Sequence, residues 1–250
     1  MWRRIHPVLL MEKTKPEFDQ FAESYEKELN RALPLGAGEG AKFARIKAAH
    51  LRRQLILAFG SKARPTLLDV GCGIGLLDES LKPFFPHLAG FDVSPESIRL
   101  AQKRNPEVRY KTSEGTLFPF EDREFDGVFA VCVLHHVPEE GRKDFIQEAY
   151  RVLRPGGFFF LYEHNPWNPL TRWVVSRCSF DRDALLLTPN EGHRLLMQNG
   201  FEPAGGGALI FLPVEASAWQ SWEARWLSGI PLGTQYFLAG KKPVPNAGKE

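Results

Sequence analysis

The glycine-rich stretch from Leu67 to Gly75 contains residue types that could bind a ligand through the main chain. It reads Leu-Leu-Asp-Val-Gly-Cys-Gly-Ile-Gly, an apolar run followed by alternate glycines. This pattern predicts a buried strand that turns sharply into a helix beginning near Leu76. Glycines let the main chain approach a ligand closely, and the helix N-terminus offers unpaired N–H groups to an anionic group. The stretch therefore predicts a ligand-binding turn.

The spacing of the glycines narrows the ligand. A dinucleotide-binding turn has the pattern G-x-G-x-x-G, which would require glycine where this chain has Leu76. The chain instead has G-x-G-x-G, ending at Gly75, which is the form used for S-adenosylmethionine (SAM). Asp92 follows the turn by about 20 residues, where an acid accepts hydrogen bonds from ribose hydroxyls. We therefore predict a SAM site, with an NAD-dependent oxidoreductase as the disfavoured alternative.

Histidines follow two of the predicted strands, at the edge where this ligand would lie. The sulfonium of SAM makes its methyl group electrophilic, so an acceptor hydroxyl would need correct placement and a base. Imidazole, whose pKa is about 6.5, suits that task. The candidates, in order, are His136, His164 and His135, with a structural contact that shapes the pocket as the alternative for His136. Glu163 and Trp167 are expected to bind or orient the substrate.

Strands and helices that alternate along the chain must position these residues. Predicted strands lie at 67–70, 87–92, 108–111, 125–131 and 158–162, separated by predicted helices that begin near 76, 95 and 138. Two more strands are expected within 201–212 and 233–239. The alternation predicts an α/β fold with a doubly wound, parallel sheet. Ligands bind at the carboxyl ends of such strands, where Glu114 and Gly115 follow the third strand and are candidates for contact with adenine.

Additional segments flank this predicted core on both sides. Apolar residues recur at helical spacing over 16–31 and 39–59, ahead of the first strand, and these helices could cover the ligand. Tyr25 is a candidate for that covering role, with simple packing as the alternative. We expect one domain over 1–250: a helical cap at 1–60, a SAM-binding core at 61–163, and substrate-side insertions with the last strands at 164–250.

Three tryptophans, Trp219, Trp222 and Trp226, are spaced three and four residues apart and so share one helical face. This stripe could pack in the core, form a lid over an apolar substrate, or lie on a membrane surface. Because basic residues do not flank the stripe as an interfacial helix would require, we expect core or lid packing.

Composition limits the partners. Lys and Arg number 32 against 30 Asp and Glu, a formal charge of +2, so no strong basic field favours nucleic acid and a small-molecule acceptor is expected. Three cysteines without metal-type pairing predict no metal site and a reduced, cytoplasmic setting. No stretch approaches the roughly 20 apolar residues of a membrane span, so stable membrane insertion is not expected. The oligomeric state is left open.

The chain resembles the class I SAM-dependent methyltransferases of the methyltransferase type 11 group over most of 18–240. Five ordered motifs carry the resemblance: Leu68-Asp69-Val70-Gly71-Cys72-Gly73-Ile74-Gly75, Asp92-Val93-Ser94, Phe118-Pro119-Phe120 leading to Phe125-Asp126, Val133-Leu134-His135-His136-Val137 and Arg151-Val152-Leu153-Arg154-Pro155-Gly156-Gly157. The resemblance implies a seven-stranded, mostly parallel, Rossmann-like sheet with an antiparallel last strand. It also implies an N-terminal helix whose tyrosine, here Tyr25, contacts the cofactor.

The resemblance further implies roles for individual positions. Asp69, Gly71 and Gly73 would hold the methionine part of SAM, Asp92 the ribose, and Glu114 with Gly115 the adenine. Glu114 departs from the family, which more often has Asp there. The positions beside these motifs complete the predicted cofactor site: Cys72, Val93 and Cys132.

The implied activity is transfer of the SAM methyl group to a small-molecule acceptor, with oxygen as the expected position. Carbon or nitrogen methylation of a small metabolite or lipid-like acceptor is the alternative, and an inactive SAM-fold interaction protein is a rival from another class. The segment 163–183 does not identify the acceptor.

Overall fold

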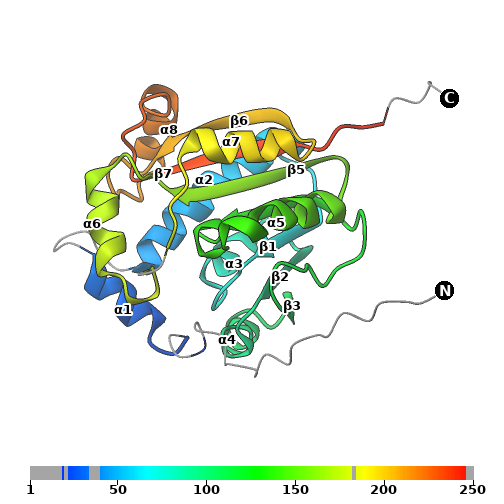
Figure 1. The fold of residues 1–250 in the computed structure, drawn as a ribbon, viewed down its shortest axis with the longest axis horizontal. Coiled ribbons are helices and arrows are strands. Elements are labelled where there is room, and N and C mark those ends of the chain that lie inside the picture. Colours follow the sequence, from blue (N-terminus) through cyan, green and yellow to red (C-terminus); the bar gives the residue numbers. More distant parts are fainter. Residues whose placement is uncertain (1–18, 20–21, 34–39, 182–183, 246–250) are drawn as a thin grey trace, which may run out of the picture.

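A seven-stranded sheet forms the centre of the computed structural model, which describes residues 19, 22–33, 40–181 and 184–245 (Figure 1). The strand order is β3-β2-β1-β4-β5-β7-β6. The strands are β1 (Leu67–Val70), β2 (Leu88–Asp92), β3 (Arg109–Thr112), β4 (Phe125–Val131), β5 (Leu153–His164), β6 (Glu202–Leu209) and β7 (Gln235–Lys241). The helices are α1 (Tyr25–Ala32), α2 (Gly40–Phe59), α3 (Leu76–Leu81), α4 (Pro95–Arg104), α5 (Glu139–Val152), α6 (Pro169–Arg177), α7 (Pro189–Gln198) and α8 (Ser217–Trp226).

Strand direction confirms the predicted fold class. Strands β1 to β5 pair in parallel, while β7 runs antiparallel to both β5 and β6. The chain builds outward from β1 through β2 to β3, then returns to place β4 on the other side of β1. The carboxyl ends of β1 and β4 therefore flank the point where strand order reverses, which is where doubly wound sheets bind ligands.

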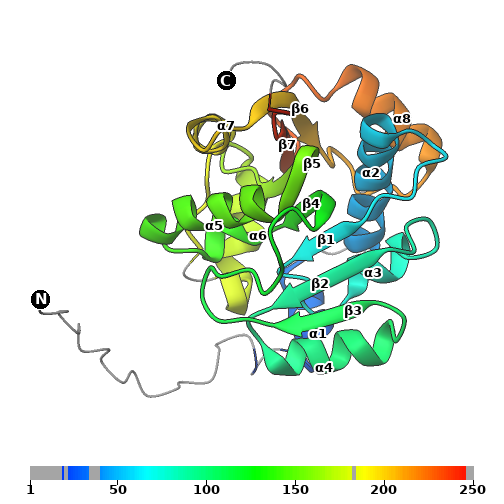
Figure 2. The same ribbon diagram turned by 90° about the vertical axis from the view of Figure 1, so that its right-hand side faces the viewer.

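Helices cover both faces of the sheet (Figures 1 and 2). Because side chains alternate along a strand, β4 sends Val128 to one apolar cluster and Phe129 to the other. The cluster around Val128 includes residues of α5 and α7, and the cluster around Phe129 includes residues of α2 and α3. Full burial of each such side chain contributes about 2 kcal/mol. The two clusters hold the strand ends, and hence the site, in fixed positions.

Local signals set several helix starts as expected. Ser94 caps α4 by accepting a hydrogen bond from the Ser97 amide, and Pro95 occupies the first helical position. Thr188 and Glu191 form a capping box at the start of α7. Asn168 caps α6 by accepting a hydrogen bond from the Thr171 amide, and this cap is not among those predicted from the sequence.

Two boundaries differ from the expectations. Strand β5 begins at Leu153 rather than at 158, because Leu153 pairs with Phe125 and the Gly156 amide donates to the Lys242 carbonyl. The helix expected over 16–31 is represented by α1. The side chain of Tyr25 lies outside the described residues, so its predicted covering role stays a prediction.

Core packing, one of the two arrangements expected for the tryptophan stripe, is wrong for Trp222 and Trp226, which are 48% and 61% exposed, while the lid arrangement stays a prediction. The buried residue of α8 is Glu223, 7% exposed. Its carboxylate accepts hydrogen bonds from the amides of Ile210 and Phe211, where β6 has ended. Those otherwise unsatisfied amides determine which face of the helix turns inward. None of the helices in the described part of the chain is both long and apolar enough to cross a membrane.

Candidate active site

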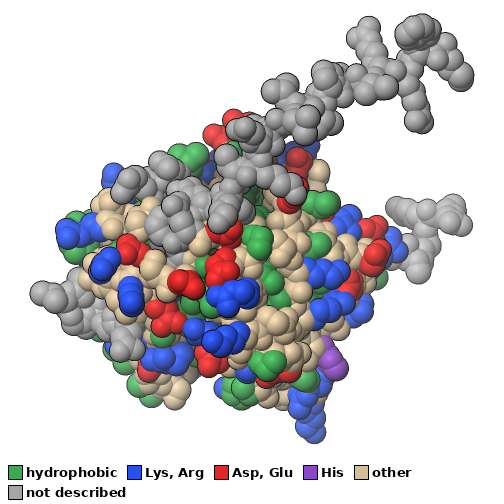
Figure 3. Space-filling view, turned by 90° about the horizontal axis from the view of Figure 1, so that it is seen from below, with side chains coloured by type: hydrophobic (Ala, Val, Ile, Leu, Met, Phe, Trp, Pro, Cys, Tyr) green, Lys and Arg blue, Asp and Glu red, His purple; other side chains and the backbone are tan. Residues whose placement is uncertain are grey.

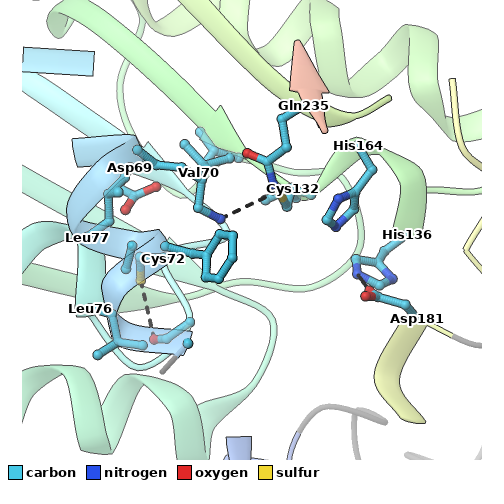
Figure 4. A pocket seen from close by; sticks show the side chains of 18 of the residues that line it. Asp69, Val70, Cys72, Leu76, Leu77, Cys132, His136, His164, Asp181 and Gln235 are labelled. Atoms are coloured by element: carbon cyan, nitrogen blue, oxygen red, sulfur yellow. Dashed lines mark hydrogen bonds and ion pairs between the residues drawn. The ribbon is translucent and has the colours of Figure 1, made fainter. Parts of the chain in front are cut away.

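A cavity of 710 Å³ opens at the carboxyl ends of β1 and β4. The glycine turn after β1 and the end of β2 form one end of the cavity. The ends of β4 and β5 and the start of β7, together with α6, form the other. In Figure 4, Asp69, Cys72 and Leu76 lie at the first end, and His136, His164 and Asp181 lie at the second. The volume suits a cofactor together with part of a second ligand.

The turn after β1 is shaped by backbone conformations that favour glycine. Gly71 has φ +70°, and a Cβ there would lie 2.6 Å from a methyl carbon of Val133. Gly73 has φ +52°, but a Cβ there would meet no described atom within 4 Å, because the position faces the cavity. The Gly73 amide donates to Asp92 Oδ2 at 2.9 Å, and the Ser94 amide donates to Asp92 Oδ1 at 2.9 Å. The Asp92 carboxylate thus ties the glycine turn to the start of α4.

Asp69 gives the same end of the cavity an acidic group. Burial raises the pKa of Asp69 well above its usual value, and the nearby carboxylates of Asp78 and Asp92 raise it further. Burial also raises the pKa of Asp78 to about 6, although Tyr110 donates a hydrogen bond to it at 2.6 Å. Acids crowded in this way would be stabilised in their ionised form by a cation. This end of the cavity is therefore suited to a positively charged ligand.

The end of β4 carries unusual backbone geometry. Cys132 has φ +60°, a left-handed conformation that costs a non-glycine residue roughly 1–2 kcal/mol. Lys47 Nζ lies 3.7 Å from the Cys132 sulfur, and Gln235 Nε2 lies 3.3 Å from it. The amide oxygen of Gln235, Oε1, is buried and accepts no hydrogen bond from the described residues. Lys47 and Gln235 thus bring a cation and an amide to the cavity wall. Figure 4 shows Gln235 beside Cys132.

Glu163 lies behind this wall and does not line the cavity. Its carboxylate is fully buried and accepts from the amides of Val133 and Leu134 at 3.2 and 2.8 Å. His135 Nδ1 donates to the second carboxylate oxygen at 2.5 Å. All of these contacts lie within the protein, and through them Glu163 positions the His135 ring and the turn after β4. The expectation that Glu163 binds or orients the substrate stays a prediction.

Asp181 joins the histidines from the opposite side. Its Oδ1 lies 3.3 Å from His136 Nε2 and 3.5 Å from His135 Nε2. Burial alone would lower the pKa of His135, but the carboxylates of Glu163 and Asp181 outweigh it and raise the pKa to about 10. His164 has the opposite shift, because burial and then the charge of His135 lower its pKa to about 4. At neutral pH the group thus holds a charged His135 and a neutral His164.

The same cluster has the residue types of a metal site, since ligand atoms of His135, His136 and Asp181 lie within 4.8 Å of one another. A metal ion needs neutral imidazole ligands. Here two buried carboxylates hold a proton on His135 with a pKa of about 10, so a metal would first have to displace that proton. We therefore interpret the cluster as a buried ion-pair network.

Comparison with known proteins finds a family model that matches the central part of the chain. Residues 68–161 match the Methyltransf_11 family, described as a methyltransferase domain. The chain is 30% identical over 179 residues to the phthiotriol/phenolphthiotriol dimycocerosates methyltransferase of Mycobacterium tuberculosis (strain H37Rv), covering 69% of this chain and 63% of the relative. It is 32% identical over 149 residues to the demethylmenaquinone methyltransferase of Chlorobaculum tepidum, covering 58% and 57%. The matched region thus spans less than two thirds of each relative.

Solved structures agree at the level of fold. A SAM-dependent methyltransferase of Thermotoga maritima, described as a possible histamine N-methyltransferase, superposes with a TM-score of 0.65 at 20% identity. The match covers 90% of this chain and 98% of that one. Residues 68–161 of this chain thus form a methyltransferase domain, on a fold shared with SAM-dependent methyltransferases. The family uses SAM as its methyl donor, which agrees with the glycine spacing of the turn.

The predicted site residues divide into those that line the cavity and those that do not. Ten of them line the cavity: Asp69, Gly71, Cys72, Gly73, Asp92, Val93, Gly115, Cys132, His136 and His164. Glu114, Glu163 and Trp167 are not among the lining residues, and Trp167 is 45% exposed outside the cavity. His135 is buried behind the wall. The expectation that Trp167 binds or orients the substrate stays a prediction.

Among the charged and amide side chains of the lining, three were not predicted from the sequence: Lys47, Asp181 and Gln235. No motif marks any of them. Lys47 comes from α2, Asp181 follows α6, and Gln235 begins β7, so long-range folding alone brings them to the end of β4. The only sequence signal was that the segment 163–183 follows the carboxyl end of β5.

Proposed function

We propose that this chain transfers the methyl group of SAM to the oxygen of a small-molecule acceptor that has an apolar part. The observation that carries the proposal is a single cavity that runs from the glycine turn to the His136–Asp181 pair. The curated relatives, which are lipid and quinone methyltransferases, support an acceptor with apolar character. Carbon or nitrogen methylation of such an acceptor is the alternative.

Residues at the glycine end fit the methyl donor. SAM supplies an electrophilic methyl group on a sulfonium. Asp69, Gly71 and Gly73 would hold its methionine part, since the acidic pocket and the open backbone there suit a cationic ligand. Asp92 would accept from the ribose, and Gly115 would lie by the adenine. Helix α2 contributes Lys47 to the lining, which supports a capping role for this helix within the predicted cap.

His136 is our candidate for the general base and Asp181 for the residue that positions it. A carboxylate beside Nε2 favours the tautomer that carries its proton there, which makes Nδ1 the basic nitrogen. The base would take the proton of an acceptor hydroxyl as the oxygen bonds to the methyl carbon, and the carbon–sulfur bond of SAM would break to leave the neutral thioether S-adenosylhomocysteine. His164 is the second candidate, because its low pKa keeps it neutral at the cavity wall.

The test combines a binding and a turnover measurement. Incubation with isotope-labelled SAM and extracts of lipids and small metabolites, followed by mass spectrometry, should identify a labelled product. His136→Gln should lower kcat by about a hundredfold or more and leave SAM affinity unchanged by calorimetry. His193→Gln, at an exposed position of α7, is the matched control.

Each outcome has a defined meaning. Unchanged kcat in His136→Gln would remove that residue as the base. A protein that binds NAD but not SAM would contradict the whole proposal. SAM binding without turnover in any extract would favour the inactive interaction protein.

A further inference from the structure

Exposed apolar side chains surround the acceptor end of the cavity. They lie on α6, on α8 and on the loops beside them: Trp167, Leu170, Trp173, Leu212, Val214, Trp222, Trp226, Ile230 and Leu232. We call these nine residues the apolar rim. Leu170 and Leu212 also line the cavity, so the rim is continuous with its mouth. Figure 1 places α6 and α8 at the same end of the molecule.

The rim has a fixed structure in which polar groups point inward. Asn165 donates to the carbonyls of Pro231 and Gly233 at 3.1 and 2.8 Å, and Asn168 donates to the Leu232 carbonyl at 2.6 Å. These bonds join the start of α6 to the loop before β7. The rim segments are therefore held together by buried or bridging polar side chains while their apolar side chains face outward.

Helix α8 reverses the usual arrangement of a surface helix. It buries the carboxylate of Glu223 and exposes the rings of Trp222 and Trp226. Trp219 donates from Nε1 to Glu223 at 3.2 Å, and its ring stacks on Trp222 at 5.3 Å. In water this arrangement leaves apolar area unburied, at a cost of about 25 cal/mol per Å². An apolar or interfacial environment would remove that cost.

Arginines accompany the tryptophans. Arg177 lies over the Trp173 ring at 4.7 Å, and Arg225 lies over the Trp226 ring at 5.4 Å. Arg172 is also exposed on α6. Over 165–177 and 210–234, all of which are described, the acids are Glu215, paired with Arg45, and the buried Glu223. The expectation that no basic residues flank the tryptophan stripe is thus corrected by the fold, which places arginines on both α6 and α8.

The face in Figure 3 has a different character. It carries Lys and Arg interspersed with Asp and Glu over its described part. Helix α4, at the bottom of Figure 1, contributes ion pairs of Arg104 with Glu26 and with Glu79. A mixed surface of this kind suits water. Among the described residues, exposed tryptophan accompanied by an excess of positive charge occurs on the rim.

We propose that the apolar rim docks this methyltransferase on a lipid surface that contains anionic headgroups. Tryptophan is suited to the boundary between headgroups and acyl chains, and arginine to the headgroups themselves. The cavity mouth would then face the bilayer, so that an amphiphilic acceptor could enter without crossing water. The inference rests on the proposed function for the identity of the substrate class, while docking itself can be measured separately.

The test is flotation of the full chain with vesicles of phosphatidylcholine that contain about one third phosphatidylglycerol. The wild-type protein should float with the vesicles. The double variant Trp222→Ser/Trp226→Ser should lower the partition coefficient about a hundredfold, and Arg177→Glu/Arg225→Glu roughly thirtyfold. Trp222→Phe/Trp226→Phe should restore most of the binding, because the ring area is retained.

A matched control removes exposed apolar side chains outside the rim. Leu57 and Val244 are 69% and 62% exposed, so Leu57→Ser/Val244→Ser should float as the wild type does. SAM affinity, measured by calorimetry on every variant, reports whether the fold is intact.

Several results would overturn the docking proposal. These are a wild type that does not float, a tryptophan double variant that floats equally well, and a rim that instead forms a dimer which sediments as one and dissociates in that variant. Flotation without SAM binding would keep the docking surface and reject the proposed function. SAM-dependent turnover without flotation would keep the proposed function and reject the docking surface.

Discussion

The donor and acceptor ends of the cavity are built in different ways. At the donor end, one short segment provides the glycine turn, and the Asp92 carboxylate holds it through main-chain amides. At the acceptor end, side chains arrive from α2, from the turn after α6 and from β7: Lys47, Asp181 and Gln235. The difference teaches that a ligand bound by backbone can be inferred from a local pattern, whereas one bound by assembled side chains cannot.

The two ends also treat charge differently. Asp69 and Asp78 are buried acids whose pKa values are raised, so the donor end gains stability when a cation enters. At the acceptor end, Glu163 and Asp181 neutralise the charge of His135 within the protein. The acids of the donor end thus face a cavity that a cation could enter, while those of the acceptor end already pair with a charged imidazole.

The largest expected effect separates the donor end from ordinary backbone strain. Gly73→Val should weaken SAM binding roughly a thousandfold, about 4 kcal/mol, because the new side chain occupies ligand space. Gly60→Val is the matched control, since Gly60 has φ +92° with open space around it. Calorimetry should find normal SAM affinity in the control, and equal losses in both variants would attribute the effect to strain.

Next in size is the loss of the buried network at the acceptor end. Glu163→Gln should lower the free energy of unfolding by about 3 kcal/mol, because His135 and two amides lose a charged partner. Glu96→Gln, in an exposed ion pair with Arg99, should cost less than about 1 kcal/mol. Urea denaturation measures both, and a Glu163 variant as stable as the control would contradict the described network.

The pH dependence of that difference sharpens the assignment. His135 has a pKa of about 10 when folded and about 6.5 when unfolded, so its ion pairs contribute fully below pH 6.5. The contribution declines as pH rises through about 10. The stability difference between wild type and Glu163→Gln should therefore shrink over that range in urea titrations. A difference that is constant with pH would mean that His135 is neutral.

A smaller effect is expected at the donor end, where SAM binding should release a proton. Burial and the neighbouring carboxylates raise the pKa of Asp69, and a cationic ligand that favours the ionised form would lower that pKa on binding. SAM affinity should therefore increase with pH, and Asp69→Asn should weaken binding about tenfold and abolish most of that dependence. Calorimetry in buffers of different ionisation enthalpy would detect the released proton. Identical proton release in the variant would assign it to another group.

The smallest expected effect is that of chelation. Because a proton on His135 occupies the position where a metal would bind, EDTA should leave SAM binding and turnover unchanged. Loss of turnover that Zn²⁺ restores would reverse this interpretation of the His135, His136 and Asp181 cluster.

Local sequence was sufficient wherever neighbouring residues decide the outcome. The caps at Ser94 and Thr188, the strand-turn-helix at Gly71 and the parallel sheet all depend on residues a few positions apart or on simple periodicity. The same reasoning failed for α8. A spacing of three and four residues shows that the tryptophans share a face. Which face is buried depends instead on the amides of Ile210 and Phe211 after β6, which donate to Glu223.

The sequence by itself therefore determined the fold class, the methyl donor and the cavity edge, because glycines and an acid at set spacings act through the backbone that they belong to. Only the tertiary structure decided that Glu163 supports His135, that Asp181 faces His136, and that apolar side chains surround the cavity mouth. Those arrangements depend on contacts between segments far apart in the chain, and no local pattern records which segments will meet.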